Sequence, residues 1–261
     1  MKQFRNALAS TGLLLMIASF VWMQCLPRPI AKLKTAQPSP KREPFVAVVL
    51  DPGHGGQDSG AVCGGMLEKD LTLDVARRID RLLEAEGVAT LMTRQSDTYL
   101  SPADRAKFAN RVSDCIFVSI HFNEDNKPVS SGVETYYAAG QVTSRSSVLA
   151  SWLPFLWPAP SDSPNVESQN LAAIIQEALV TRTQSRNRGT KAKQFFVIAN
   201  VPGPAVLVEG GFLSNKEDIS KLASDDYREE IAAAVTDGIL RYRAVAKQRQ
   251  STLAVTAPGK R

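Results

Sequence analysis

The chain has 261 residues, of which 44% are hydrophobic and 22% charged, and its formal net charge is +5. This composition excludes an intrinsically disordered protein, and the length fits one domain of about 200 residues with tails. The modest positive charge suits polyanionic partners in general, but no nucleic-acid-binding motif accompanies it, so nucleic acid is not an expected partner.

The N-terminus has the composition of an export signal. Lys2 and Arg5 give it a positive start, and residues 11–23 are almost wholly apolar, which is short for a membrane span of about 20 residues. Residues suited to cleavage are scarce after this stretch. Residues 1–26 are therefore predicted to be a signal peptide or an uncleaved signal anchor, with a buried helix as a third interpretation.

A linker follows, because residues 27–44 contain five prolines. These features predict an exported protein of the periplasm or cell envelope, either free or anchored to the inner membrane. Membrane contact is expected only through the N-terminal segment, and a misread N-terminus would make the protein cytoplasmic.

Residues 45–243 alternate short apolar runs with helical patterns, whereas residues 244–261 are predicted to be a basic flexible tail. Strands are predicted over 45–50, 88–93, 115–120, 133–138, 194–199 and 204–209. Helices are predicted from Glu68 to a stop at Gly87, from a cap at Ser101 and Pro102, over 165–184 and over 225–242. This alternation indicates a single α/β domain with a largely parallel, twisted sheet of about six strands and helices on both faces.

Polar side chains with metal-binding chemistry stand at strand ends. His54 follows the first strand in the turn DPGHGG, His121 ends a central strand and Glu209 ends the last, while Glu68 begins the first helix. Because active sites of open α/β sheets lie beyond the carboxyl ends of the strands, we expect all four to meet on one rim.

Two imidazoles and one carboxylate make a catalytic zinc site, with the fourth position left to water. In this interpretation Glu209 transfers the proton, and Asp51 either holds the loop or orients an imidazole. Each residue also has an ordinary explanation, as a turn histidine, a strand-end histidine or a helix-terminal carboxylate.

Several motifs occur in an order that resembles one family. VVLDPGHGGQDSGAV carries His54, MLEKDLTLDVA carries Glu68, FVSIHFN carries His121 and VLVEGGFLSN carries Glu209, with GVETYY and RNRGTK between the last two. From about Val46 to Tyr242 the chain is similar to the zinc-dependent N-acetylmuramoyl-L-alanine amidases of the type-3 amidase family.

The resemblance implies one Zn²⁺ held by His54, Glu68 and His121, with Glu209 as the catalytic carboxylate. It implies peptidoglycan as substrate, cut between the lactyl group of N-acetylmuramic acid and L-alanine during wall remodelling and cell separation. A monomer is expected. A zinc peptidase acting within the stem peptide and a non-catalytic wall-binding module are the alternatives.

Residues 141–164 depart from some family members, in which a long insertion plugs the zinc site until an activator removes it. Here the segment is short and contains prolines, so we expect no plugging helix, and a protein activator stays open as a partner. Its aromatic residues suit packing, a short lid, a partner or a membrane. Cys63 and Cys115 are not expected to pair, because a strand separates them by about 20 Å.

Overall fold

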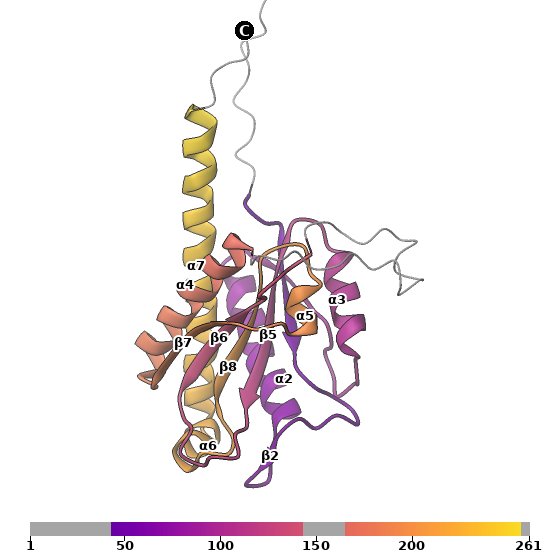
Figure 1. The fold of residues 1–261 in the computed structure, drawn as a ribbon, viewed down its shortest axis with the longest axis vertical. Coiled ribbons are helices and arrows are strands. Elements are labelled where there is room, and N and C mark those ends of the chain that lie inside the picture. The colour runs from indigo at the N-terminus through magenta and orange to yellow at the C-terminus, as the bar shows by residue number, and fades with distance from the viewer. Residues whose placement is uncertain (1–42, 143–164, 257–261) are drawn as a thin grey trace, which may run out of the picture. The chain divides into compact units, whose positions relative to one another are not determined.

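The computed structural model describes residues 43–142 and 165–256, and Figure 1 shows their fold. The predicted signal segment, nearly all of the predicted linker and residues 143–164 lie outside the described residues. No helix within the described ranges has the length and apolar character needed to cross a membrane.

A six-stranded sheet forms the centre, in the order β4-β1-β5-β8-β6-β7. All neighbouring pairs are parallel except β6 and β8, which are antiparallel. The predicted largely parallel α/β sheet is therefore confirmed. The strands are β1 Ala47–Pro52, β4 Ala89–Met92, β5 Cys115–Asn123, β6 Val133–Tyr137, β7 Asn187–Ala192 and β8 Ala205–Phe212.

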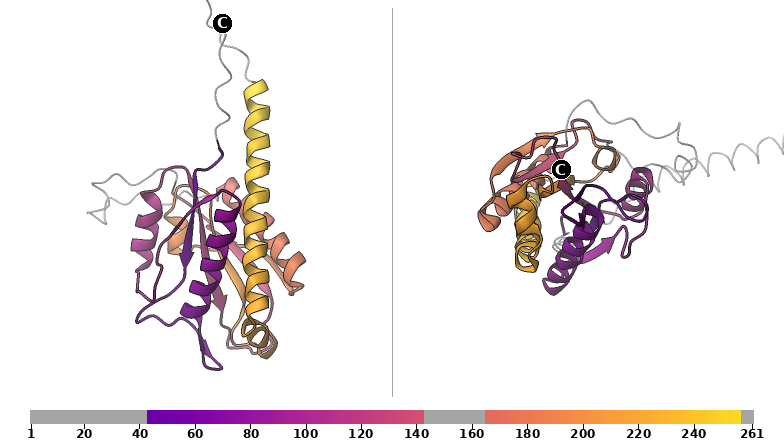
Figure 2. Two further views of the ribbon diagram at one scale, coloured as in Figure 1. Left: turned by 180° about the vertical axis from the view of Figure 1, so that it is seen from behind. Right: turned by 90° about the horizontal axis from the view of Figure 1, so that it is seen from below.

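Helices cover both faces of this sheet, as Figure 2 shows from two further directions. The helices α2 (Glu68–Ala85), α4 (Val166–Thr183) and α7 (Asp225–Thr256) pack on one face, and α3 (Pro102–Asn110) and α5 (Phe196–Ala199) pack on the other. Along β5, Val118 belongs to the first cluster and Phe117 to the second. Because side chains alternate along a strand, His121 lies on the α3 and α5 side.

The helix ends follow the local sequence signals. Ser101 accepts a hydrogen bond from the backbone N–H of Asp104 and caps α3, and Asn165 caps α4 in the same way. Gly87 follows α2 with a φ of 68°, a conformation that glycine adopts without strain. Full burial of Ile79 and Leu83 on α2 contributes about 1.5–3 kcal/mol each.

The strand predicted over 194–199 is wrong. Phe196–Ala199 forms the short helix α5, and the strand lies earlier, at β7. The apolar run FVIA packs as a helical turn on the sheet, with three of its four side chains buried. Strand β7 is polar because it is an edge strand whose residues are exposed or half-buried, so its sequence lacks an apolar pattern.

The last helix is longer than predicted, since α7 continues past Tyr242 to Thr256. Residues 244–256 are thus helical rather than an unstructured tail. The small hairpin of β2 (Val62–Cys63) and β3 (Met66–Leu67) and the helix α6 (Lys216–Leu222) were not predicted. Cys63 and Cys115 are not bonded to each other.

Candidate metal centre

His54 stands in the turn that follows β1, with a left-handed φ of 58°. Two buried arginines hold this turn through its carbonyl oxygens. Arg105 donates to the carbonyls of Pro52 and His54, both at 2.6 Å, and Arg94 donates to those of Pro52 and Gly53. These contacts fix a conformation that a non-glycine residue rarely adopts.

Asp51 supports the same turn through its side chain, which forms no hydrogen bond with His54 or His121. Its buried carboxylate accepts hydrogen bonds from Thr93 at 2.6 Å, Arg105 at 2.8 Å and Ser119 at 2.8 Å. Of the two roles considered for Asp51, the contacts therefore match holding the loop. Sequence reasoning missed Arg94 and Arg105, because nothing in their spacing marks an arginine on a strand end or helix as buried.

Glu68 is the first residue of α2 and is 5% exposed. Its Oε2 accepts from the backbone N–H of Ala61 at 2.9 Å, and its Oε1 accepts from that of Phe122 at 3.1 Å. The carboxylate is thereby oriented by two backbone donors, one in the loop before the helix and one in β5.

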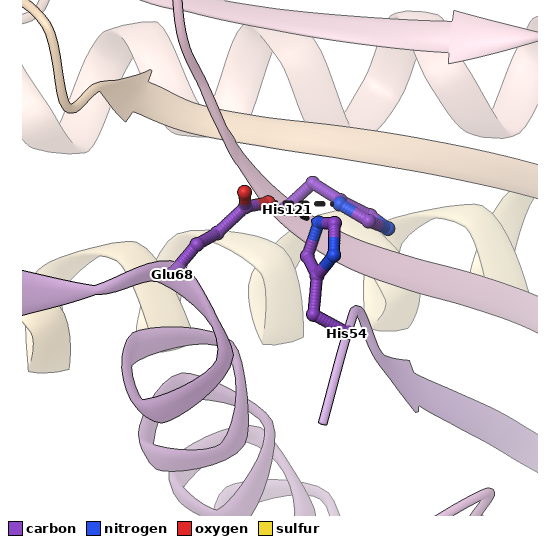
Figure 3. A group of neighbouring side chains, drawn as sticks. All are labelled: His54, Glu68 and His121. Atoms are coloured by element: carbon purple, nitrogen blue, oxygen red, sulfur yellow. Dashed lines mark hydrogen bonds and ion pairs between the residues drawn. The ribbon is translucent and has the colours of Figure 1, made fainter. Parts of the chain in front are cut away.

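The predicted ligands come together, as Figure 3 shows. Glu68 Oε1 lies 3.0 Å from His54 Nε2 and 2.9 Å from His121 Nδ1, and one donor atom from each residue lies within 4.8 Å of the others. Donors around a tetrahedral zinc ion with bonds of about 2.0–2.2 Å lie roughly 3.4 Å apart. The donor set and its spacing therefore fit a zinc ion.

The charges in this group are coupled. Burial alone would raise the pKa of Glu68, but hydrogen bonds from His121 and His54 hold it well below its usual value. Burial alone would lower the pKa of His54, but Glu68 and then Asp58, whose Oδ1 lies 2.9 Å from His54 Nδ1, raise it above its usual value. Glu68 is thus a carboxylate anion, the form in which it can bind a metal.

Glu209 lies beside the group, because it pairs with His121 in the register of β5 and β8. It is 8% exposed, and its Oε2 has no hydrogen-bond partner among residues 43–142 and 165–256. Burial raises the pKa of Glu209 well above its usual value, and the negative charges of Glu68 and Glu134 raise it further. A buried carboxyl group with a free oxygen and a raised pKa is suited to proton transfer.

All four residues line one cleft of about 390 Å³. Tyr99 and Leu100 form one wall, and Phe195, Phe196 and Val197 form another. The four residues expected on one rim therefore lie together in this cleft, although they are far apart in sequence.

Replacing Glu209 by glutamine should raise the melting temperature of zinc-free protein near neutral pH by a few degrees. A raised pKa in the folded state stabilises the fold only below the unfolded value of about 4.3, and this contribution is lost as pH rises through the folded pKa. A tenfold difference in proton affinity between the folded and unfolded states corresponds to about 1.4 kcal/mol, and 1 kcal/mol shifts the melting temperature by about 2–4 °C in such a domain.

Melting curves of both proteins from pH 4 to 8, recorded after chelation, test this. The difference between variant and wild type should grow with pH. A difference that does not change with pH would show that the Glu209 carboxyl titrates normally.

An α/β domain with two imidazoles, a buried carboxylate and a second, unpaired carboxyl group at the carboxyl edge of its sheet has the make-up of a metal-dependent hydrolase. Comparison with known proteins gives the same class. The profile of the N-acetylmuramoyl-L-alanine amidase family (Amidase_3) matches residues 48–241. The chain belongs to this family, and it is an amide hydrolase.

Two relatives come from Bacillus subtilis (strain 168). N-acetylmuramoyl-L-alanine amidase LytC is 35% identical over 195 residues, which are 75% of this chain and 35% of LytC. The germination-specific N-acetylmuramoyl-L-alanine amidase is 32% identical over 212 residues, covering 75% of this chain and 78% of that protein. The chain thus spans about a third of LytC but most of the second relative.

Solved structures of amidases resemble this chain as well. N-acetylmuramoyl-L-alanine amidase AmiC2 of Nostoc punctiforme is 34% identical with a TM-score of 0.63, covering 76% of this chain and 96% of that one. The CwlD amidase from Clostridioides difficile, solved in complex with the GerS lipoprotein, is 27% identical with a TM-score of 0.65, covering 76% and 98%.

Proposed function

We propose that this protein is a zinc-dependent N-acetylmuramoyl-L-alanine amidase that cuts peptidoglycan between the lactyl group of N-acetylmuramic acid and L-alanine of the stem peptide. The observation that carries the proposal is the cluster of His54, Glu68 and His121 within 4.8 Å, beside the unpaired carboxyl group of Glu209. The choice of the bond that is cut rests on two relatives, both of which are N-acetylmuramoyl-L-alanine amidases.

In this proposal His54, Glu68 and His121 hold the zinc ion, and Glu209 moves the proton. A bound zinc ion supplies Lewis-acid activation of a carbonyl group and of water at neutral pH. Glu209 accepts the proton of the attacking water on its carboxylate and returns it to the nitrogen of the departing L-alanine.

Export is part of the proposal, because peptidoglycan lies outside the cytoplasmic membrane and residues 1–26 are predicted to be a signal segment. Roles in wall remodelling and cell separation follow from the same substrate. A protein activator is also proposed, and it is supported by the CwlD structure, which holds a GerS lipoprotein.

Digestion of purified peptidoglycan by the protein, with and without zinc, tests the function. The expected products are stem peptides with a free L-alanine amino terminus and glycan without peptide, identified by mass spectrometry and formed only with zinc. Cleavage inside the stem peptide would instead identify a peptidase, and intact peptidoglycan with zinc bound would point to a binding module or a missing activator.

Replacing Gly53 by alanine should weaken zinc binding by at least about tenfold, a loss typical of residues that orient metal ligands. A Cβ atom at Gly53 would overlap the imidazole ring of His121. The φ of Gly53 is not positive, so the backbone itself accepts alanine. Titration against a chromophoric chelator measures the affinity.

Gly87→Ala is the control for this variant. Gly87 has a φ of 68° and open space around its Cβ position, so alanine there strains the backbone far from the cleft. The control should lose stability but bind zinc like wild type. Unchanged affinity in Gly53→Ala would mean that His121 is not held against Gly53 when zinc binds.

A further inference from the structure

A second polar cluster adjoins the cleft, centred on the carboxylate of Glu134 in β6. Glu134 is 1% exposed and accepts four hydrogen bonds. Its Oε1 accepts from Asn123 Nδ2 at 2.9 Å and from the hydroxyl of Tyr136, and its Oε2 accepts from Arg188 Nε at 2.8 Å and from Lys191 Nζ. Burial alone would raise the pKa of Glu134, but Lys191, Tyr136 and Arg188 lower it. This carboxylate is fully satisfied and charged.

Arg188 uses only one side of its guanidinium group in this cluster. Its Nε donates to Glu134, and its Cζ lies 4.6 Å from the ring centroid of Phe212. Within 43–142 and 165–256, no hydrogen-bond partner is found for its terminal Nη1 and Nη2. The side chain is 24% exposed. Arg188 thus presents a fixed, solvent-accessible pair of N–H donors.

The position of Arg188 follows from the strand register. Glu209 pairs with His121 on one side and with Glu134 on the other, and β7, which carries Arg188, adds the next strand. Two strand spacings separate β7 from β8, about 10 Å. The arginine side chain reaches back over β6 to Glu134, which shortens this distance. In an extended stem peptide, a group two residues beyond the cut amide lies about 7 Å from that amide. Such a group comes within reach of Arg188.

Positive charges gather on this side of Glu209. Arg188 and Lys191 both contact the carboxylate of Glu134, and Asp125 is a further negative charge that interacts with Arg188. Lys193, also exposed, lies with its Nζ 4.6 Å from the ring centroid of Phe195, a residue of the cleft wall. An arginine fork in a positively charged surround matches a carboxylate in both shape and charge.

We propose that Arg188 binds a carboxylate of the stem peptide, namely the α-carboxylate of the γ-linked glutamate that follows L-alanine. The inference rests on the proposed function. It assigns Arg188 as a specificity-determining residue and Glu134 as the residue that positions it. The other explanation is that Arg188 serves only to neutralise Glu134, for which Asn123, Tyr136 and Lys191 already supply three donors.

Two defined muropeptides test the proposal with the full-length protein and zinc. Their stem peptides are identical except that the second residue carries either an α-carboxylate or an α-carboxamide. Wild type, Arg188→Ala and Arg188→Lys are compared by KM and kcat, and melting curves check folding. Arg186→Ala is the matched control, because Arg186 is an exposed arginine of the same RNRGTK segment.

Wild type should prefer the carboxylate substrate, with a KM lower by about tenfold to a hundredfold, as expected for hydrogen bonds between charged groups. Arg188→Ala should lose this preference through KM while keeping kcat within about twofold, and Arg188→Lys should keep part of it. Arg186→Ala should behave like wild type.

Equal KM values of wild type for both substrates would overturn the inference and leave the amidase function intact. The same loss on both substrates in Arg188→Ala would also overturn it, because a structural role does not depend on the substrate. Binding of both muropeptides to Glu209→Gln, measured by calorimetry, gives the same comparison without turnover. If neither substrate is cleaved, the calorimetric comparison decides, and equal affinities of Glu209→Gln for the two muropeptides would overturn the inference.

Discussion

Replacing Glu209 by glutamine is expected to lower kcat by about 10²–10⁴-fold, the usual contribution of a positioned general acid and base. Glutamine keeps the size of the side chain but cannot accept the proton of water. The carboxyl group is buried beside His121, and within the described part of the chain its Oε2 has no hydrogen bond that the substitution would break. The variant should therefore fold and bind one zinc ion, which metal analysis can verify.

Glu124→Gln is the matched control, because Glu124 is an exposed carboxylate that lines the same cleft. Its rate should stay within a few-fold of wild type. A Glu209→Gln variant that keeps zinc and retains more than about a tenth of the wild-type kcat would show that another group carries the proton. Loss of zinc from this variant would instead indicate that Glu209 is a ligand.

Replacing Arg105 by methionine should destabilise the fold by about 3–5 kcal/mol, because removal of one partner leaves the charge of Asp51 buried and unpaired. At about 2–4 °C per kcal/mol, the melting temperature should fall by roughly 6–20 °C. Arg105 is 4% exposed, and it also donates to the carbonyls of Pro52 and His54. The turn that carries His54 should loosen, so zinc affinity should fall too.

The double variant Asp51→Asn with Arg105→Met separates these two effects. It removes the buried charge, so part of the stability should return, while zinc affinity should stay low because the carbonyl of His54 still lacks its donor. Arg77→Met is the control, since Arg77 is exposed and, among the described residues, donates a hydrogen bond only to the carbonyl of Gln95. A loss in Arg105→Met no larger than in this control would mean that the Asp51 charge is solvated in another way.

Much of the centre could be predicted from the sequence because its residues stand at the ends of apolar strands. His54, His121 and Glu209 each follow such a run, and the carboxyl ends of strands on one sheet edge must lie close together. Glu68 is placed with them because it begins the first helix, after the loop that returns from His54. Strand ends are thus visible in sequence, and the rim they form follows from sheet geometry.

Other features could not be predicted, since their cause lies in tertiary contacts. The edge strand β7 is polar, and its pairing with β6 decides its structure. In α7, residues 247–252 are exposed, so no apolar stripe marks this part of the helix, although lysine and glutamine favour it. Arg105 and Glu134 are charged residues in buried places, and a sequence does not say which charges find partners.

The strand order affects when the centre forms during folding. The centre draws on β1, α2, β5 and β8, and the parallel pairings match Ala47 with Cys115 and Phe117 with Ala205, segments far apart in the chain. Such non-local pairings form late and slowly during folding, because closing a large loop costs conformational entropy before the pairing contributes any stability. A nascent or partly folded chain has its four reacting groups dispersed. The four groups therefore come together only when β1, α2, β5 and β8 have assembled, and a fragment that lacks one of these elements lacks a complete centre.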